Sequence, residues 1–179
     1  MKNKFSQLAS LFVLLALCLH ADDALLKNGD FSEANDKGLP KEWTPNNDLQ
    51  QTLVVDKEAK PEGGQQSLRI DITKAAKDQG NLWQGFRNLK KDTNFILEGM
   101  LKSSADGLAF LQVKLSIDNP KSETGRFSSD KSSAEWKAVK IEFNSGKCDK
   151  ALVCIRFKQD EAVVGKSAWI ANLKLTEKK

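Results

Sequence analysis

The chain has 179 residues, of which 40% are hydrophobic and 29% are charged, and it contains one histidine and no tyrosine. Its 28 basic and 24 acidic residues are interspersed and give a net charge of only +4 at pH 7. Nucleic-acid binding requires basic side chains clustered on one face, so we expect no nucleic-acid partner. The length suits one domain that buries about two thirds of its unfolded surface.

The start of the chain has the pattern of a secretory signal peptide. Lys2 and Lys4 give it a positive charge, and an uncharged apolar run follows at residues 11–19. This order is typical of export signals. The run is shorter than the roughly 20 residues that a membrane-spanning helix needs, so no transmembrane segment is expected.

Ala21 is a small residue suited to the position before a cleavage site. We therefore expect a signal peptide at residues 1–21 and a single mature domain at residues 22–179, secreted or periplasmic. A lipid anchor on Cys18 is the alternative. Leu17 argues against it, because a small residue normally precedes a lipidated cysteine.

The only histidine, His20, lies in the expected signal peptide. The mature chain would then contain no imidazole, which excludes Ser/His and Cys/His nucleophile pairs and any zinc site that needs histidine. A glycosidase that uses two carboxylates remains compatible with the composition. The small size of the domain argues against a catalytic domain, and we expect no enzyme.

Short β-strands are predicted along most of the mature chain, because apolar and polar residues alternate. Leu68, Ile70 and Ile72, for example, alternate with Arg69 and Asp71. The predicted strands, in chain order, are 25–31 and 49–55 with weak patterns, then 67–73, 95–102, 109–117, 139–143, 153–157 and 168–175.

Helical periodicity is nearly absent, and only residues 74–79 could form a helical turn before Gly80. A turn is predicted at residues 144–146, which read Asn-Ser-Gly. Regularly spaced strands separated by such turns favour an all-β fold, an antiparallel β-sandwich or jelly roll.

Six short motifs occur in one order along the chain. They are Asn28–Phe31 (NGDF), Pro40–Trp43 (PKEW), Ser67–Ile72, Phe95–Ser103, Trp136 at the start of a strand, and Ile170–Leu175. In this order they resemble carbohydrate-binding modules of the family 4/9 type. The resemblance covers nearly the whole mature chain and implies a galactose-binding domain-like jelly roll that binds a polysaccharide or glycan.

The resemblance also implies a structural calcium ion, held by an acidic residue after the first strand and an Asp in the last strand. This sequence has Ser32 and Ala171 at those positions. Calcium prefers six to eight oxygen ligands, including carboxylates. We therefore expect no cofactor and doubt the calcium site, although Glu33 could replace one ligand.

A sugar-binding site needs an aromatic face for stacking and planar polar groups for the hydroxyls. The resemblance places such a site on a polar sheet face, where Trp83, Gln84 and Gln112 are candidate carbohydrate-binding residues. Arg126 is the fourth candidate, since it lies in the predicted loop 119–133 and could reach over that face. Core packing of Trp83 is equally open. Lys114 and Ser116 share the face of Gln112, with a solvated strand as the alternative. The other tryptophans are expected to be structural: Trp43, Trp136 and Trp169.

Cys148 and Cys154 remain in the mature chain, and export would permit a disulfide between them. An extended chain would hold their Cα atoms about 20 Å apart, whereas a bridge needs about 6 Å. The bridge therefore requires residues 147–150 to fold back. A buried Cys154 and an exposed Cys148, both reduced, are the alternative.

Three functions fit the sequence. The leading one is a monomeric, noncatalytic carbohydrate-binding module that stands alone or assists glycoside hydrolysis. The second is a cell-surface structural or adhesion domain that does not bind sugar, which the small number of aromatic residues favours. The third is a small protein that itself acts on glycosyl bonds.

Overall fold

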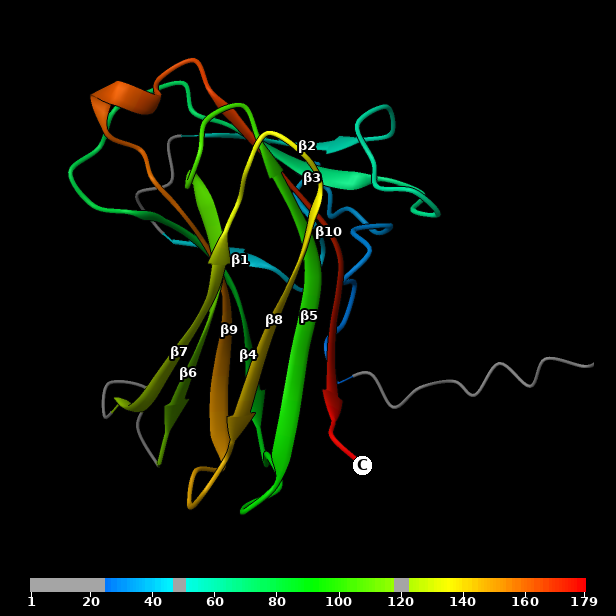
Figure 1. Cartoon of the computed structure of the whole chain (residues 1–179), viewed down its shortest axis with the longest axis vertical. Helices are drawn as coiled ribbons and strands as arrows, with labels where there is room; N and C mark the ends of the chain where they lie inside the picture. The colour runs from blue at the N-terminus through cyan, green and yellow to red at the C-terminus, as the bar shows by residue number, and fades with distance from the viewer. Residues whose placement is uncertain (1–24, 47–50, 118–122) are drawn as a thin grey trace, which may run out of the picture.

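The protein is described by a computed structural model that covers residues 25–46, 51–117 and 123–179. Two five-stranded antiparallel sheets pack face to face (Figure 1). Sheet I has the order β1-β4-β9-β6-β7, and sheet II has the order β2-β3-β10-β5-β8. The predicted all-β antiparallel sandwich is confirmed.

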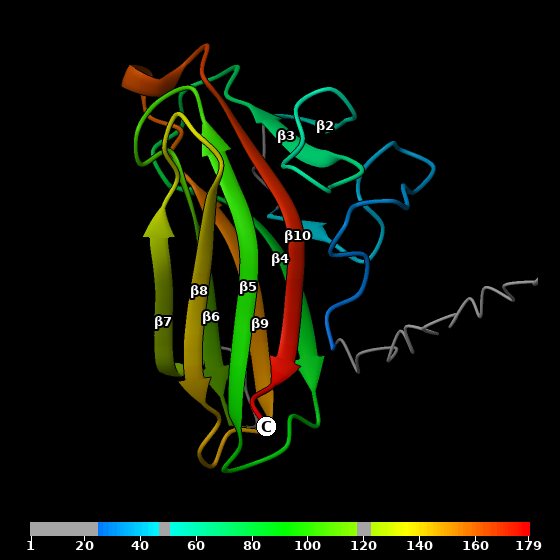
Figure 2. The same cartoon turned by 45° about the vertical axis from the view of Figure 1, so that its right-hand side comes forward.

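The strands of sheet I are β1 (Thr44–Pro45), β4 (Gly80–Arg87), β9 (Lys150–Phe157), β6 (Ala109–Ser116) and β7 (Glu123–Lys131). Those of sheet II are β2 (Thr52–Asp56), β3 (Ser67–Asp71), β10 (Ser167–Glu177), β5 (Asn94–Ser103) and β8 (Lys137–Asn144). Figure 2 shows the two layers, with β8, β5 and β10 in front of β6 and β9.

The core lies between the sheets and is built by the predicted alternation. In β6, for example, Leu111 and Val113 are fully buried in the core cluster, whereas Lys114 points to the opposite face. Gly80 allows the closest packing in sheet I. A Cβ atom there would lie 1.9 Å from the ring of Phe157, so only glycine fits beside that side chain.

Two local predictions were wrong. Residues 25–31 form no strand, because Asn28 and Phe31 adopt positive φ angles of 48° and 58° that end an extended run. The segment instead binds β10 through single backbone hydrogen bonds. Residues 74–79 form bends and no helical turn. The helical element of the described chain is a 3-10 turn at Glu161–Val163.

The predicted strand at 49–55 is partly confirmed, since β2 begins at Thr52 while residues 49 and 50 lie outside the described residues. Strands β4 and β7 were not predicted as strands. The turn at residues 144–146 is confirmed, with Gly146 at a φ of 50°. Within the part of the chain that the structure describes, no helix has the length and hydropathy to cross a membrane.

Candidate functional site

Trp83 lies on the outer face of sheet I. Its neighbour Leu82 is fully buried in the core, and alternation along β4 therefore directs Trp83 away from it. The register places Trp83 opposite Cys154, which in turn lies opposite Gln112. Residues directly opposite in antiparallel strands share a face, so these three side chains form one row across the sheet.

Two further rows lie beside it. Gly85, Leu152, Lys114 and Arg126 are cross-strand neighbours, and the next row contains Arg87, Lys150 and Ser116. We call the surface formed by the three rows, together with the row of Asn81, Arg156 and Phe110, the Trp83 face. Four strands contribute to it: β4, β9, β6 and β7.

A hollow of about 320 Å³ opens on the Trp83 face between β4 and β9. Ligand sites in proteins commonly start at about this size. Gly85 forms part of its floor, because a Cβ atom there would lie 3.3 Å from Leu152 and 3.5 Å from the ring of Trp83. The hollow is lined by Trp83, Gly85, Phe86, Arg87, Ser116, Lys150, Ala151 and Leu152.

The middle of the Trp83 face is covered by its longer side chains. Cys154 is only 1% exposed and Gln112 6%, although both point away from the core cluster. The amide nitrogen of Gln112 donates to Ser128 Oγ at 3.1 Å, but its Oε1 is buried without a partner among the described residues.

Two neighbouring side chains also have a buried polar atom without a described hydrogen-bond partner. Asn81 Oδ1 and Arg156 Nε are buried and make no hydrogen bond within the described chain. Arg156 does donate from its other nitrogen to Gln79 Oε1 at 3.1 Å. Buried polar atoms without partners are rare in folded proteins, and each calls for an explanation. The Trp83 face therefore carries hydrogen-bonding capacity that the described residues do not use.

Three of the four predicted binding residues come together on this surface, namely Trp83, Gln112 and Arg126, and Lys114 and Ser116 join them. Arg126 was expected in a loop, but it lies in β7 opposite Lys114. The sequence analysis missed the six other residues that line the hollow: Gly85, Phe86, Arg87, Lys150, Ala151 and Leu152. The alternation of β9 could have indicated Leu152, but β4 had not been predicted as its neighbour.

Gln84 does not join the Trp83 face, because it points to the opposite side of β4. Its amide oxygen accepts from Lys27 N at 2.8 Å, and its nitrogen donates to the carbonyls of Lys27 at 2.9 Å and Glu42 at 3.4 Å. Gln84 therefore ties the N-terminal segment to sheet I. The prediction that Gln84 shares a binding face with Trp83 was wrong, because adjacent residues of a strand point to opposite faces.

The proposed disulfide is a second correction, since neither Cys148 nor Cys154 is bridged. Cys148 is buried in the core cluster, and its sulfur lies 2.9 Å from Thr124 Oγ1. Cys154 lies on the outer side of the sheet. The two thiols are therefore directed to opposite sides of sheet I.

The outer face of sheet II has a different organisation, centred on Asp56. Its Oδ1 accepts from the backbone N–H groups of Glu58 and Ala59, both at 2.9 Å. Its Oδ2 accepts from Arg69 and from the indole of Trp169, both at 3.1 Å. We call this surface the Trp169 face. Burial opposes ionisation of Asp56, but these hydrogen bonds and the charge of Arg69 lower its pKa below the usual value.

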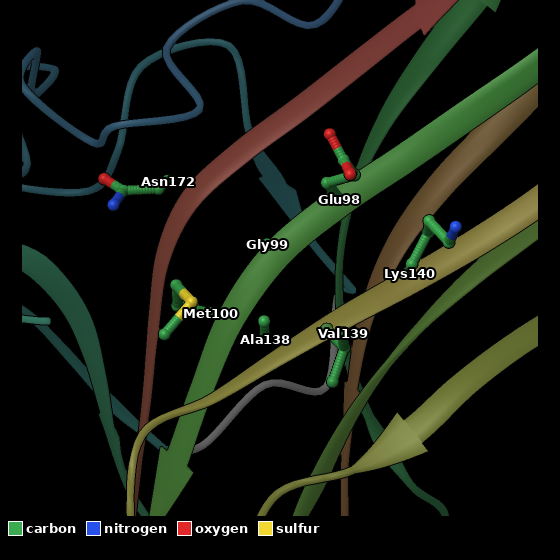
Figure 3. A pocket seen from close by; sticks show the side chains of 7 residues that line it. All are labelled: Glu98, Gly99, Met100, Ala138, Val139, Lys140 and Asn172. Atoms are coloured by element: carbon green, nitrogen blue, oxygen red, sulfur yellow. The ribbon is translucent and has the colours of Figure 1, made fainter. Parts of the chain in front are cut away.

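The Trp169 face also has a hollow, of about 500 Å³, between β10, β5 and β8 (Figure 3). It lies over the small residues Gly99 and Ala138, and its walls include Glu98, Lys140 and Asn172. No aromatic side chain lines it. Lys140 is already paired with Glu142 at 2.7 Å. This hollow is larger than that of the Trp83 face, but it lacks a surface on which a sugar ring could stack.

The residues at the expected calcium site do not fit a metal ion. The Asn28 amide nitrogen donates to the carbonyl oxygens of Glu33 and Lys41, both at 2.8 Å, and so uses two oxygens that a cation could have taken. The Glu33 carboxylate is paired with the Lys41 ammonium at 2.9 Å. Ala171 offers no side-chain oxygen, and Ser32 donates to Asp30 at 3.0 Å.

Comparisons with solved structures identify the fold. The chain is similar to TmCBM61, solved in complex with β-1,4-galactotriose, with a TM-score of 0.60 and 16% identity over 87% of this chain and 99% of that one. It is also similar to the CBM22-1 xylan-binding domain of Paenibacillus barcinonensis Xyn10C, with a TM-score of 0.57 and 16% identity over 88% and 96% of the two chains.

A third similar structure is the enzymatically active domain of tailspike protein 4 of bacteriophage CBA120. The TM-score is 0.64 and the identity 11%, over 87% of this chain but only 21% of the tailspike chain. No protein-family model matches the sequence, and no curated protein matches it. The similarity to the solved structures shows that the chain has the jelly-roll fold of carbohydrate-binding modules.

Proposed function

We propose that this protein is a noncatalytic carbohydrate-binding module whose ligand lies on the Trp83 face. The observation that carries the proposal is the position of Trp83, which is half-buried, points away from the core and borders a hollow floored by Gly85. An aromatic ring in this setting can stack on the C–H face of a sugar.

The polar groups of the same face suit the hydroxyls of a sugar. Arg87 and Ser116 line the hollow and can form hydrogen bonds with hydroxyl groups, while the unpartnered atoms of Gln112, Arg156 and Asn81 are buried beneath the same face. Sugar sites combine apolar contact with a few polar groups that fix orientation. The similarity in fold to a galactotriose-bound module and a xylan-binding domain supports the same conclusion.

We propose that the protein does not hydrolyse its ligand. Glycosidases need two carboxyl groups beside the glycosidic bond. Of the four strands of the Trp83 face, β4, β9 and β6 contain neither Asp nor Glu, and β7 contains Glu123 and Asp130, of which Asp130 is paired with Lys137 at 2.8 Å. Assistance to a separate glycoside hydrolase is compatible with this role.

Three finer points belong to the proposal. The ordered motifs from Asn28 to Leu175 support membership of the family 4/9 type. The pattern of residues 1–21 supports export to the periplasm or the medium. We further propose that the domain acts as a monomer.

The test is a binding panel of soluble polysaccharides, including xylan and β-1,4-galactan, measured by affinity electrophoresis and calorimetry. The Trp83→Ala variant should keep its fold and lose about 2 kcal/mol of binding free energy, or about thirtyfold in Kd. Trp169→Ala is the matched control, because it removes the same ring from the outer face of the other sheet.

Trp169→Ala should bind as tightly as the wild type. If Trp83→Ala also bound as tightly, the Trp83 face would not be the site. If the wild type bound no member of the panel, the carbohydrate-binding proposal would be wrong. Release of reducing ends from a bound polysaccharide would contradict the noncatalytic assignment.

A further inference from the structure

We infer that the hollow on the Trp83 face receives an acetyl group, so that the protein selects an acetylated glycan. This inference rests on the proposed function and specifies its ligand class. It follows from an apolar wall and a buried hydroxyl group that line the same hollow beside the stacking ring.

One side of the hollow is apolar. A Cβ atom on Gly85 would lie 3.3 Å from Cδ2 of Leu152 and 3.5 Å from Cζ3 of Trp83, so a leucine methyl group and the edge of the indole ring both lie next to the glycine. Leu152 is half-buried and lies opposite Gly85 in the register of β4 and β9. A hydroxyl group against this wall would lose water without gaining a hydrogen bond, whereas a methyl group there gains apolar contact.

A polar group lines the same hollow. Ser116 is only 6% exposed, and its hydroxyl group makes no hydrogen bond to any residue that the structure describes. Buried polar groups in folded proteins are normally hydrogen-bonded. The carbonyl oxygen of a ligand would supply the missing partner, with the serine hydroxyl as the donor.

The two features lie close enough for one small group to meet both. Ser116 lies opposite Lys150, and Leu152 is two residues further along β9, so Ser116 and Leu152 are diagonal neighbours. Such neighbours are about 7 to 8 Å apart. A methyl carbon in contact with Leu152 at about 4 Å and a carbonyl oxygen about 3 Å from Ser116 Oγ can therefore belong to one substituent.

An acetyl group combines these two features. Its methyl group suits the wall of Leu152 and Trp83, and its carbonyl oxygen accepts a hydrogen bond from Ser116. A bare hydroxyl group lacks the apolar end, and a methyl group alone lacks the acceptor. The register places Ser116 between Lys150 of β9 and Glu123 of β7. Because an acetyl group is uncharged, its recognition does not depend on the charges of these neighbours.

The experiment compares glycans that differ in acetylation. Acetylated xylan is paired with the same xylan after alkaline deacetylation. A chitin oligosaccharide is paired with a cellulose oligosaccharide of equal length, which carries a hydroxyl group in place of each N-acetyl group. Calorimetry measures Kd for the wild type, Ser116→Ala, Leu152→Asn and Ile96→Asn, and thermal unfolding checks that each variant is folded.

Ile96→Asn is the matched control for Leu152→Asn. Ile96 is half-buried and lies between the buried core residues Phe95 and Leu97 of β5, so alternation directs it to the outer face of sheet II. The control therefore replaces an apolar side chain by the same polar one on the face without Trp83.

We expect the wild type to bind the acetylated member of at least one pair about tenfold or more tightly than the other member. Ser116→Ala should lower this preference by about fivefold, which corresponds to the loss of one hydrogen bond. Leu152→Asn should remove most of it, and Ile96→Asn should keep the wild-type value. Preference for acetylated xylan alone would assign an O-acetyl group, and preference for the chitin oligosaccharide alone would assign an N-acetyl group.

Equal binding of both members of each pair, with Trp83→Ala weakening both, would overturn this inference and leave the proposed function intact. A preference that Ser116→Ala and Leu152→Asn left unchanged, or that Ile96→Asn lowered equally, would also overturn it. Binding to other polysaccharides of the panel without binding to either acetylated glycan would have the same meaning. If the wild type bound no glycan of the pairs or of the panel, the proposed function itself would fail.

Discussion

Two tryptophans occupy corresponding places on the outer faces of the two sheets, and both are half-buried. The indole nitrogen of Trp169 donates to Asp56, which accepts three further hydrogen bonds. The indole of Trp83 makes no hydrogen bond to any residue that the structure describes, and it borders a hollow. Similar exposure therefore accompanies two different environments.

The difference is the reason for proposing that the Trp169 face is structural and that the Trp83 face binds the ligand. On the Trp169 face, the polar groups around Asp56 satisfy one another and hold β2, β3 and β10 together. On the Trp83 face, buried atoms of Asn81, Gln112 and Arg156 have no described partner. Unused polar groups lower stability, and their concentration beside the half-buried ring of Trp83 supports the proposal of a ligand site there.

The largest expected effect concerns Asp56. Asp56→Asn should lower the free energy of unfolding by about 3 kcal/mol, because it removes the charge that pairs with Arg69 and weakens the hydrogen bonds from Glu58 and Ala59. Urea unfolding measures this loss. Glycan affinity should not change. A variant that lost affinity but kept its stability would reverse the roles assigned to the two faces.

The same carboxylate sets part of the response to acid. The pKa of Asp56 is lower in the folded protein than its usual value. Its contribution is therefore complete above the unfolded pKa, about 4, and is lost as the pH falls through the folded value. The stability difference between wild type and Asp56→Asn should shrink between about pH 5 and pH 2. A constant difference across this range would contradict the assigned ionisation.

Gly85→Val should separate binding from stability on the Trp83 face. The side chain would fill the floor of the hollow beside Trp83 and Leu152, so we expect glycan affinity to fall by about tenfold or more. The unfolding free energy should change by less than about 1 kcal/mol, since Leu152 can yield and valine favours strands. Unchanged affinity would show that the ligand lies elsewhere.

The smallest effect is expected for Gln112→Leu. The substitution removes a buried oxygen without a described partner and leaves only Ser128 without its donor. The free energy of unfolding should stay equal or rise by up to about 1 kcal/mol, while glycan affinity falls. Chemical denaturation and calorimetry on one preparation test both parts. A clear loss of stability would identify Gln112 as structural, like Gln84.

The core of the sandwich could be predicted from sequence because burial imposes alternation. Strands β3, β5, β6, β8, β9 and β10 all follow the predicted runs. Strands β4 and β7 escaped detection, since glycine interrupts β4 and serine, threonine and charged residues fill β7. Both belong to the Trp83 face. Contact with solvent relaxes the requirement for alternating apolar residues, by which the other strands were predicted.

The candidate site was predictable in part. Gln112 and Lys114 were correctly assigned to one face, because β6 was correctly predicted. The side on which Gln84 lies depended on β4, and the pairing of Cys148 with Cys154 depended on the path after β8. Neither the side of Gln84 nor the pairing of the cysteines can be predicted from the sequence pattern of a single segment. Arg87 and Lys150 became neighbours only through the register of β4 with β9, which no single segment encodes.

The most direct test of the central claim is a titration of the protein with its tightest-binding glycan, followed by the NMR signals of the tryptophan indole N–H groups. We predict that the Trp83 signal shifts with ligand concentration, while the signals of Trp43, buried in the core, and Trp169, bound to Asp56, remain in place. A Trp169 signal that shifted while the Trp83 signal stayed fixed would place the ligand on the other sheet and contradict the account.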